Sequence, residues 1–202
     1  MDIQERANRL PIINTAHLVL RDIEVADISE AYVAWLNDPV TTRFLEVRFA
    51  PQTPDTVREY VEAKLSDTHN TKHFGIYDQD GERLVGTVTL PVISWKHIYS
   101  DVSFVIGHPG AQGKGYATEA VNAVSYYAFR RCGLAKLWGG YYGGHVASAR
   151  VFEKNGFRVE GQLRKKFVNA DGERVDHVLV GLLAEDYVPN EALLGPLPAE
   201  AE

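Results

Sequence analysis

A glycine-rich segment in the middle of the chain constrains its fold more than any other feature. Gln112-Gly113-Lys114-Gly115-Tyr116-Ala117 separates residues 99–106, which alternate like a strand, from residues 116–131, which have helical spacing. Glycines permit unusual backbone torsions and let a ligand approach the main chain. The first amides of a helix are unpaired and carry partial positive charge. This order therefore predicts a phosphate or pyrophosphate site, with a ligand-free glycine turn as the simpler alternative.

Two common nucleotide-binding motifs fit this loop poorly. A Walker A loop needs Ser or Thr after its lysine, and here Gly115 follows Lys114. A dinucleotide fingerprint needs three glycines, and Thr118 occupies the third position. The loop therefore indicates a phosphate-bearing ligand of another class.

The hydrophobic pattern predicts one mixed α+β domain. Helical spacing and strand-like alternation follow one another along the chain, separated by proline, glycine and asparagine turns. We expect an N-terminal arm over residues 1–15, the domain over 16–187 and a flexible, Pro/Ala/Glu-biased tail over 188–202. The predicted helices cover residues 26–36, 53–65, 116–131 and 146–155, and the strands 18–21, 73–77, 83–93, 99–106, 135–142, 157–160, 164–168 and 174–183.

Composition narrows the class of protein. The 202 residues are 45% hydrophobic and 24% charged, as in an ordinary globular domain, and no apolar run reaches the roughly 18 residues of a membrane span. Residues 1–6 lack the order of a secretory signal, and Cys132 is the single cysteine, so we expect a cytoplasmic protein without disulfides, away from membranes. The net charge of −6 argues against nucleic-acid binding and suits a cationic substrate, although the basic run 164–166 leaves a phosphate-bearing ligand open.

The glycine loop and four further segments resemble one protein family. Gln112-x-x-Gly115-x-Ala117 is similar to the Gln/Arg-x-x-Gly-x-Gly/Ala signature of the GNAT superfamily of N-acetyltransferases. Residues 148–157 resemble that superfamily's second motif, a short helix followed by a strand. Three segments resemble the branch that contains ribosomal-protein alanine acetyltransferases and amino-sugar N-acetyltransferases, namely residues 35–46, 160–164 and 171–176. The resemblance covers roughly residues 16–187.

The resemblance implies a fold and a co-substrate. The GNAT fold is a central, twisted, mixed but mostly antiparallel sheet of about seven strands with four helices, splayed between strands 4 and 5. Coenzyme A binds in that splay without a metal, the loop amides hold its pyrophosphate, and a backbone N–H at the strand end polarises the thioester carbonyl. The residues that the resemblance assigns to acetyl-CoA are Val105, Ile106, Gly107, Gln112, Gly113, Lys114, Gly115, Tyr116, Ala117, Thr118, Ser148 and Lys154.

Three residues are candidates for catalysis by direct acetyl transfer in a ternary complex. Asp101 lies on the strand before the loop, where related chains often carry Glu, and is the candidate general base; the alternative is a solvated strand-edge carboxylate. Ser148 matches a serine that holds the departing thiolate, or else caps its helix. His145 replaces the family's usual Asn and either orients the coenzyme, moves a proton or has only a structural role.

The acceptor is the least constrained part of the hypothesis. The expected acceptor-side residues are Trp35, Arg43, Phe44, Tyr141 and Tyr142. The alanine acetyltransferases carry a Glu where this chain has Phe167, so we expect a small amine, an amino sugar or nucleotide-linked amino sugar, as acceptor. A protein N-terminus, an aminoglycoside-type amine and a catalytically silent acyl-CoA-binding module are the alternatives. Homodimers are common in this branch, so by analogy we expect a homodimer.

Overall fold

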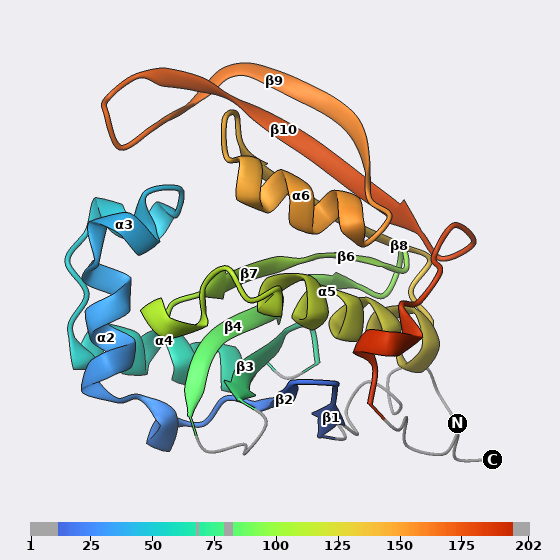
Figure 1. The fold of residues 1–202 in the computed structure, drawn as a ribbon, viewed down its shortest axis with the longest axis horizontal. Coiled ribbons are helices and arrows are strands. Elements are labelled where there is room, and N and C mark those ends of the chain that lie inside the picture. The colour runs from blue at the N-terminus through green and yellow to red at the C-terminus, as the bar shows by residue number, and fades with distance from the viewer. Residues whose placement is uncertain (1–11, 68, 79–82, 196–202) are drawn as a thin grey trace.

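The computed structural model describes residues 12–67, 69–78 and 83–195, and it confirms the mixed α+β prediction (Figure 1). Most of the expected arm and the end of the expected tail lie outside these residues. The described start of the tail is held in place, because Asn190 exchanges two hydrogen bonds with Asn122 on the central helix, at 3.0 and 3.1 Å.

In the part of the chain that the structure describes, two five-stranded sheets form the core of the architecture. All strand pairs are antiparallel except β6 with β8. The first sheet has the order β1 (Ile13–Asn14), β2 (Leu18–Asp22), β3 (Lys72–Asp78), β4 (Leu84–Leu90), β7 (Ser103–Ile106). The second has the order β5 (Ile93–Ser94), β6 (Tyr99–Asp101), β8 (Lys136–Tyr142), β10 (Arg174–Leu183), β9 (Arg158–Val168).

The predicted strand 99–106 changes sheets at Val102. Its first part, β6, pairs with β8, and its second part, β7, pairs with β4. The Val102 amide still donates to the Trp138 carbonyl of β8, at 2.8 Å, and beyond this bond β7 leaves β8. The two sheets therefore diverge at one residue, which is the predicted splay between the fourth and fifth long strands.

Within the described residues, five α-helices surround the sheets, where four were expected: α2 (Glu30–Asn37), α3 (Pro39–Thr42), α4 (Pro54–Ser66), α5 (Tyr116–Tyr126) and α6 (Val146–Lys154). The predicted helix 26–36 begins late because Ser29 caps α2 by accepting the Tyr32 amide. A 3₁₀ turn, η1 (Val25–Asp27), occupies its expected start. The unpredicted α3 follows because Asp38 is its N-cap and Pro39 suits a first helical position.

Helix α5 is the buried centre of the molecule, and it packs against strands β2, β4 and β7 of the first sheet and against α6 (Figure 1). Ala120, Val121, Ala123 and Val124 are completely buried in the main core. The helix is followed directly by a π-helical turn, η4 (Tyr127–Arg131). The predicted helix 116–131 is therefore an α-helix over its first part and a π-helix over its last five residues. Because the core holds α5 firmly, the loop at its start has a fixed place beside the splay.

Three further segments frame the splay. Helices α2, α3 and α4 lie together on one side, and the β9–β10 hairpin arches over α6 towards α3 (Figure 1). The short 3₁₀ helix η2 (Glu46–Phe49) follows α3 on that side, and η3 (Pro109–Ala111) and η5 (Glu191–Leu193) lie elsewhere along the chain. The predicted strands 157–160 and 164–168 are one strand, β9, interrupted by a bulge.

Candidate active site

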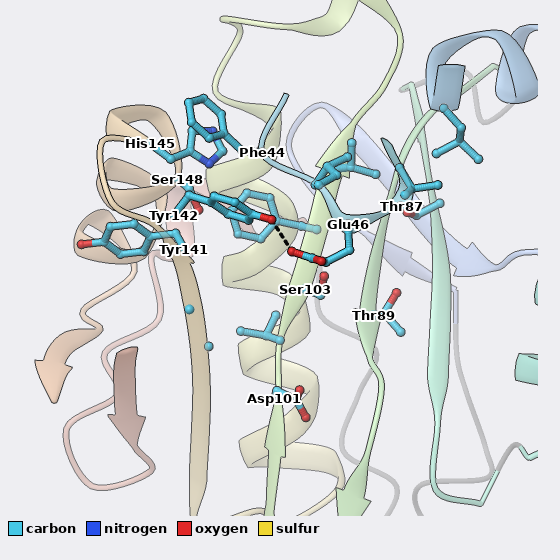
Figure 2. A pocket seen from close by; sticks show the side chains of 18 of the residues that line it. Phe44, Glu46, Thr87, Thr89, Asp101, Ser103, Tyr141, Tyr142, His145 and Ser148 are labelled. Atoms are coloured by element: carbon cyan, nitrogen blue, oxygen red, sulfur yellow. Dashed lines mark hydrogen bonds between the residues drawn. The ribbon is translucent and has the colours of Figure 1, made fainter. Parts of the chain in front are cut away.

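A cavity of about 740 Å³ opens at the point where the two sheets diverge. Its walls come from strands β3, β4, β6, β7 and β8, helices α2, α4 and α6, the η2 segment and the β9–β10 hairpin. Figure 2 shows side chains from both sheets directed into this space. A ligand inserted between β7 and β8 would therefore meet residues from almost every part of the domain.

The open edge of β7 offers backbone groups to such a ligand. The Gly107 amide donates to the Val85 carbonyl of the neighbouring strand at 3.0 Å. Backbone groups in an antiparallel pair alternate between the partner strand and the other edge. Those of Phe104 and Ile106 therefore face the splay, where Gln112 Nε2 donates to the Ile106 carbonyl at 3.2 Å. Gly107 borders the splay, but its amide is already used.

The glycine loop has the torsions that a phosphate-binding turn requires. Gly113 and Gly115 have φ of 76° and 86°, in the left-handed region that favours glycine. Gly115 is the N-cap of α5, and no side chain caps the helix, so its first amides are open. Gly113, Lys114 and Gly115 are exposed. The loop therefore fits the pyrophosphate of coenzyme A.

The other expected coenzyme residues lie in three different settings. Tyr116, Ala117 and Thr118 form the half-exposed first turn of α5, and the Thr118 carbonyl accepts from Asn155 Nδ2 at 3.2 Å. Ser148 lies in the first turn of α6 and lines the cavity. Lys154 lies exposed at the far end of α6 and does not line the cavity.

All three catalytic candidates line the cavity, but not at one point. Figure 2 shows His145 and Ser148 together near Tyr141 of β8, with Asp101 apart from them on the neighbouring strand, β6. Burial raises the pKa of Asp101, and Lys64 partly opposes this shift. Burial lowers the pKa of His145, whose ring stacks on Phe44 with centroids 4.2 Å apart. His145 is therefore neutral at pH 7.

The five expected acceptor residues separate into two groups. Phe44, Tyr141 and Tyr142 line the cavity. Trp35 does not: it packs in a second core, and a Cβ at Gly107 would lie 2.1 Å from its indole. Arg43 also lies outside, pairing with Asp171 of the hairpin at 2.7 Å.

The predicted acceptor residue Tyr142 belongs to a hydrogen-bonded cluster at the top of the cavity, whose other members, Glu46 and Arg48, were not among the predicted site residues. The Tyr142 hydroxyl donates to Glu46, as Figure 2 shows, and accepts from Arg48 Nη1 at 3.0 Å. Arg48 also donates to the carbonyls of Leu45 and Val168. Burial and the neighbouring Glu46 raise the pKa of Tyr142. Glu46 lies in the segment 35–46 that resembles the family, so the sequence offered this resemblance as a reason to include Glu46 among the site residues.

Four polar residues on the floor of the cavity were also not singled out: His73, Thr87, Thr89 and Ser103. The two threonines are two positions apart on β4 and are buried, so they share the face that lines the cavity. Their spacing at alternate positions of the predicted strand 83–93 was the sequence feature that could have indicated that both threonines lie on one face.

The formal charges of the cavity lining are negative. Glu46 and Asp101 contribute carboxylates, and among the described residues no lysine or arginine lines the cavity. The basic run 164–166 belongs to the hairpin, where Lys165 Nζ donates to the Arg174 carbonyl at 3.0 Å and Lys166 Nζ lies 3.1 Å from His177 Nδ1. The following residue, Phe167, stacks on Tyr142 in the cavity wall, with centroids 4.3 Å apart.

Within residues 12–67, 69–78 and 83–195, no group of three His, Cys, Asp or Glu side chains is arranged to hold a metal ion. Over the same ranges, no helix is both long and apolar enough to span a membrane.

Comparison with known proteins identifies the family. The Acetyltransferase (GNAT) domain family matches residues 17–158. The probable N-acetyltransferase YjcK of Bacillus subtilis is 35% identical over 64% of this chain and 70% of its own length. Spermidine N(1)-acetyltransferase of Escherichia coli is 31% identical over 66% of this chain and 76% of its own length.

A solved structure confirms the fold. The spermidine N-acetyltransferase of Vibrio cholerae, solved with CoA and spermine, superposes with a TM-score of 0.74 at 24% identity, over 84% of this chain and 97% of that one. The predicted GNAT fold, the predicted enzyme class and the predicted co-substrate are thus confirmed. The chain belongs to the GNAT family of acetyltransferases and is an acetyl-CoA-dependent N-acetyltransferase.

Proposed function

We propose that this enzyme acetylates the primary amine of a small cationic molecule that carries no phosphate. One observation supports this most directly: the cavity lining contains the carboxylates of Glu46 and Asp101, and no lysine or arginine among the described residues. A protonated amine is attracted to these carboxylates, whereas a phosphate would lose its hydration without gaining a cationic partner.

An unphosphorylated amino sugar satisfies this charge pattern. A nucleotide-linked amino sugar is less favoured, because its phosphates would need cations that the lining does not provide. Lys165 and Lys166, which suggested such an acceptor in the sequence, have their ammonium groups against other hairpin residues. We therefore narrow the expected acceptor to the unlinked amine.

The chain's own residues suggest how the transfer proceeds. Bound acetyl-CoA supplies the activated acetyl group, and the amine must lose a proton before its nitrogen attacks. Asp101 is the proposed base, since burial raises its pKa and makes it a better proton acceptor than a solvated carboxylate. The backbone N–H groups of Phe104 and Ile106 are the proposed donors to the acetyl carbonyl. The Ser148 hydroxyl is the proposed donor to the departing thiolate.

The proposed role of His145 is to shape the acceptor side of the cavity. Its ring is stacked on Phe44 and is neutral at pH 7, because burial lowers its pKa. The stack supports a fixed wall against which an acceptor packs, together with Tyr142. Glu46, held by the Tyr142 hydroxyl, is the proposed anchor for the acceptor's positive charge.

A polyamine is the second candidate acceptor. Two carboxylates in one cavity suit a molecule with two ammonium groups, and a relative at 31% identity is a spermidine N(1)-acetyltransferase. The two candidates differ in their hydroxyl groups, which an amino sugar has and spermidine lacks.

A thiol-release assay with a panel of acceptors tests the proposal. We expect release of free coenzyme A above background with glucosamine or spermidine, and little release with an alanine-starting peptide or a nucleotide-linked amino sugar. Glu46→Gln should raise the KM for the accepted amine about tenfold, the effect of losing one charge-assisted contact. Release that no amine increases, or that only the peptide increases, would contradict the proposed acceptor class.

A further inference from the structure

A row of polar side chains crosses the floor of the cavity on three neighbouring strands. His73 on β3 is paired with Thr89 on β4, and Thr89 is paired with Ser103 on β7. Directly opposed residues of antiparallel strands place their side chains on the same face. All three line the cavity, so we name them the polar row. Figure 2 shows Thr89 and Ser103 on their neighbouring strands, between Glu46 and Asp101 in this view.

The two buried members of the polar row, His73 and Thr89, are unusual because their side-chain hydrogen-bonding groups have no partner among the described residues. His73 is 4% exposed and Thr89 6% exposed, and the His73 Nδ1 has no partner among the described residues. No hydrogen bond joins the Thr89 or Ser103 hydroxyl to another described residue either. By contrast, the buried Thr71 just before β3 donates to the Pro91 carbonyl at 3.0 Å. Unpaired polar groups at a cavity wall call for a ligand.

The chemistry of the polar row suits hydroxyl groups better than ammonium groups. Burial lowers the pKa of His73 to about 4, with a smaller contribution from nearby Lys64, so its ring is neutral at pH 7. A neutral imidazole has one donor and one acceptor, and the Thr89 and Ser103 hydroxyls can each donate and accept. A ligand hydroxyl matches both kinds of group, whereas an ammonium group can only donate.

We propose that the polar row binds hydroxyl groups of the acceptor, so that the enzyme selects a hydroxylated amine, such as an amino sugar or amino alcohol, over a polyamine. This inference rests on the proposed function, in which a small amine occupies the cavity. Glu46 and Asp101 meet the charged amine, and the polar row meets the rest of the molecule. Discrimination follows because a ligand without hydroxyls would leave the buried groups of the row unpaired.

A matched pair of ligands tests this subsite by binding rather than turnover. Glucosamine and cyclohexylamine each carry one amine on a six-membered ring, with and without hydroxyls. In calorimetric titrations of the full chain saturated with coenzyme A, we expect glucosamine to bind at least about tenfold more tightly, the effect of one or more hydrogen bonds. Thr89→Val, which removes one hydroxyl and keeps the side-chain shape, should weaken glucosamine binding roughly tenfold and leave cyclohexylamine binding unchanged.

Two further variants keep the test decisive. Ser103→Ala alters an exposed member of the row, so it should reproduce the selective loss without affecting the core. Thr71→Val removes a buried hydroxyl outside the cavity, and it should change neither affinity. Equal or tighter binding of cyclohexylamine to the unaltered protein, or an equal effect of Thr89→Val and Ser103→Ala on both ligands, would overturn the proposal.

The two proposals fail in different ways. If amines are acetylated without preference for hydroxyls, the proposed function stands and the hydroxyl subsite is wrong. If glucosamine binds selectively through the row and no amine is acetylated, the subsite stands and the proposed acceptor class is wrong.

Discussion

At the scale of single residues, the setting of a carboxylate in the splay determines its pKa and its hydrogen-bond partners. Asp101 is half-buried where the strand changes sheets, and burial raises its pKa. Glu46 is held by the Tyr142 hydroxyl, which Arg48 ties in turn to the Val168 carbonyl of the hairpin. By contrast, Asp171 forms an exposed ion pair with Arg43, of a kind that contributes little to stability.

The proposed base gives a prediction at this scale. Asp101→Asn should lower kcat about 10²-fold or more, because the variant cannot accept a proton. A base works when deprotonated, so kcat/KM of the unaltered enzyme should rise with pH through the raised pKa of Asp101, above its ordinary value of 3.8. A pH–rate profile measures this limb, and Asp101→Asn should abolish it. Asp78→Asn, which alters a carboxylate outside the cavity, is the matched control. Full activity of Asp101→Asn would remove the assignment.

At the scale of elements, the loop and α5 act as one unit. Gly115 caps α5 with a φ of 86°, and a Cβ added there would meet nothing within 4 Å. The need for glycine is therefore one of backbone torsion and not of space within the protein. A substitution would disturb the open amides that begin the helix.

This distinction gives a prediction for the loop. Gly115→Ala should raise the KM for acetyl-CoA about fivefold to thirtyfold, because a left-handed alanine costs roughly 1–2 kcal/mol and shifts the amides. Gly133→Ala is the matched control: its φ is 69°, its Cβ would also meet nothing within 4 Å, and it lies beyond the other end of the helix. Both variants should lose similar stability in thermal unfolding, and only Gly115→Ala should change the KM. An equal KM change in both would show that the loop has no special role.

The elements also show which features of the fold and site can be predicted from the sequence. The apolar alternation and the glycine loop predict the strand, the turn and α5, since each depends on local spacing. Tertiary packing is harder to predict, as Trp35 illustrates. A tryptophan in a family-like segment suggested the acceptor side, but Trp35 packs in the second core against Gly107. The polar row was not predicted either, because it exists only through the pairing of His73, Thr89 and Ser103 across three strands.

At the scale of the whole molecule, two halves meet along the splay. The proposed coenzyme half comprises the loop, α5 and α6, which are joined where Asn155 donates to the Thr118 carbonyl. The proposed acceptor half comprises α2, α3, η2 and the hairpin. Arg43 at the end of α3 and Arg48 in η2 both bond to the hairpin. The loop and motif spacing predicted the helices of the first half, α5 and α6, while the binding role of their residues stays a prediction. The second half depends on contacts between residues over 100 positions apart, which local patterns do not encode.

The central claim is that the acceptor half binds a cationic amine without phosphate. Initial rates with glucosamine and glucosamine 6-phosphate, at saturating acetyl-CoA, test it most directly because the two acceptors differ only in the phosphate. The two carboxylates and the absence of lysine and arginine from the described lining predict a kcat/KM at least about tenfold higher for glucosamine. An equal or higher kcat/KM for glucosamine 6-phosphate would contradict the account.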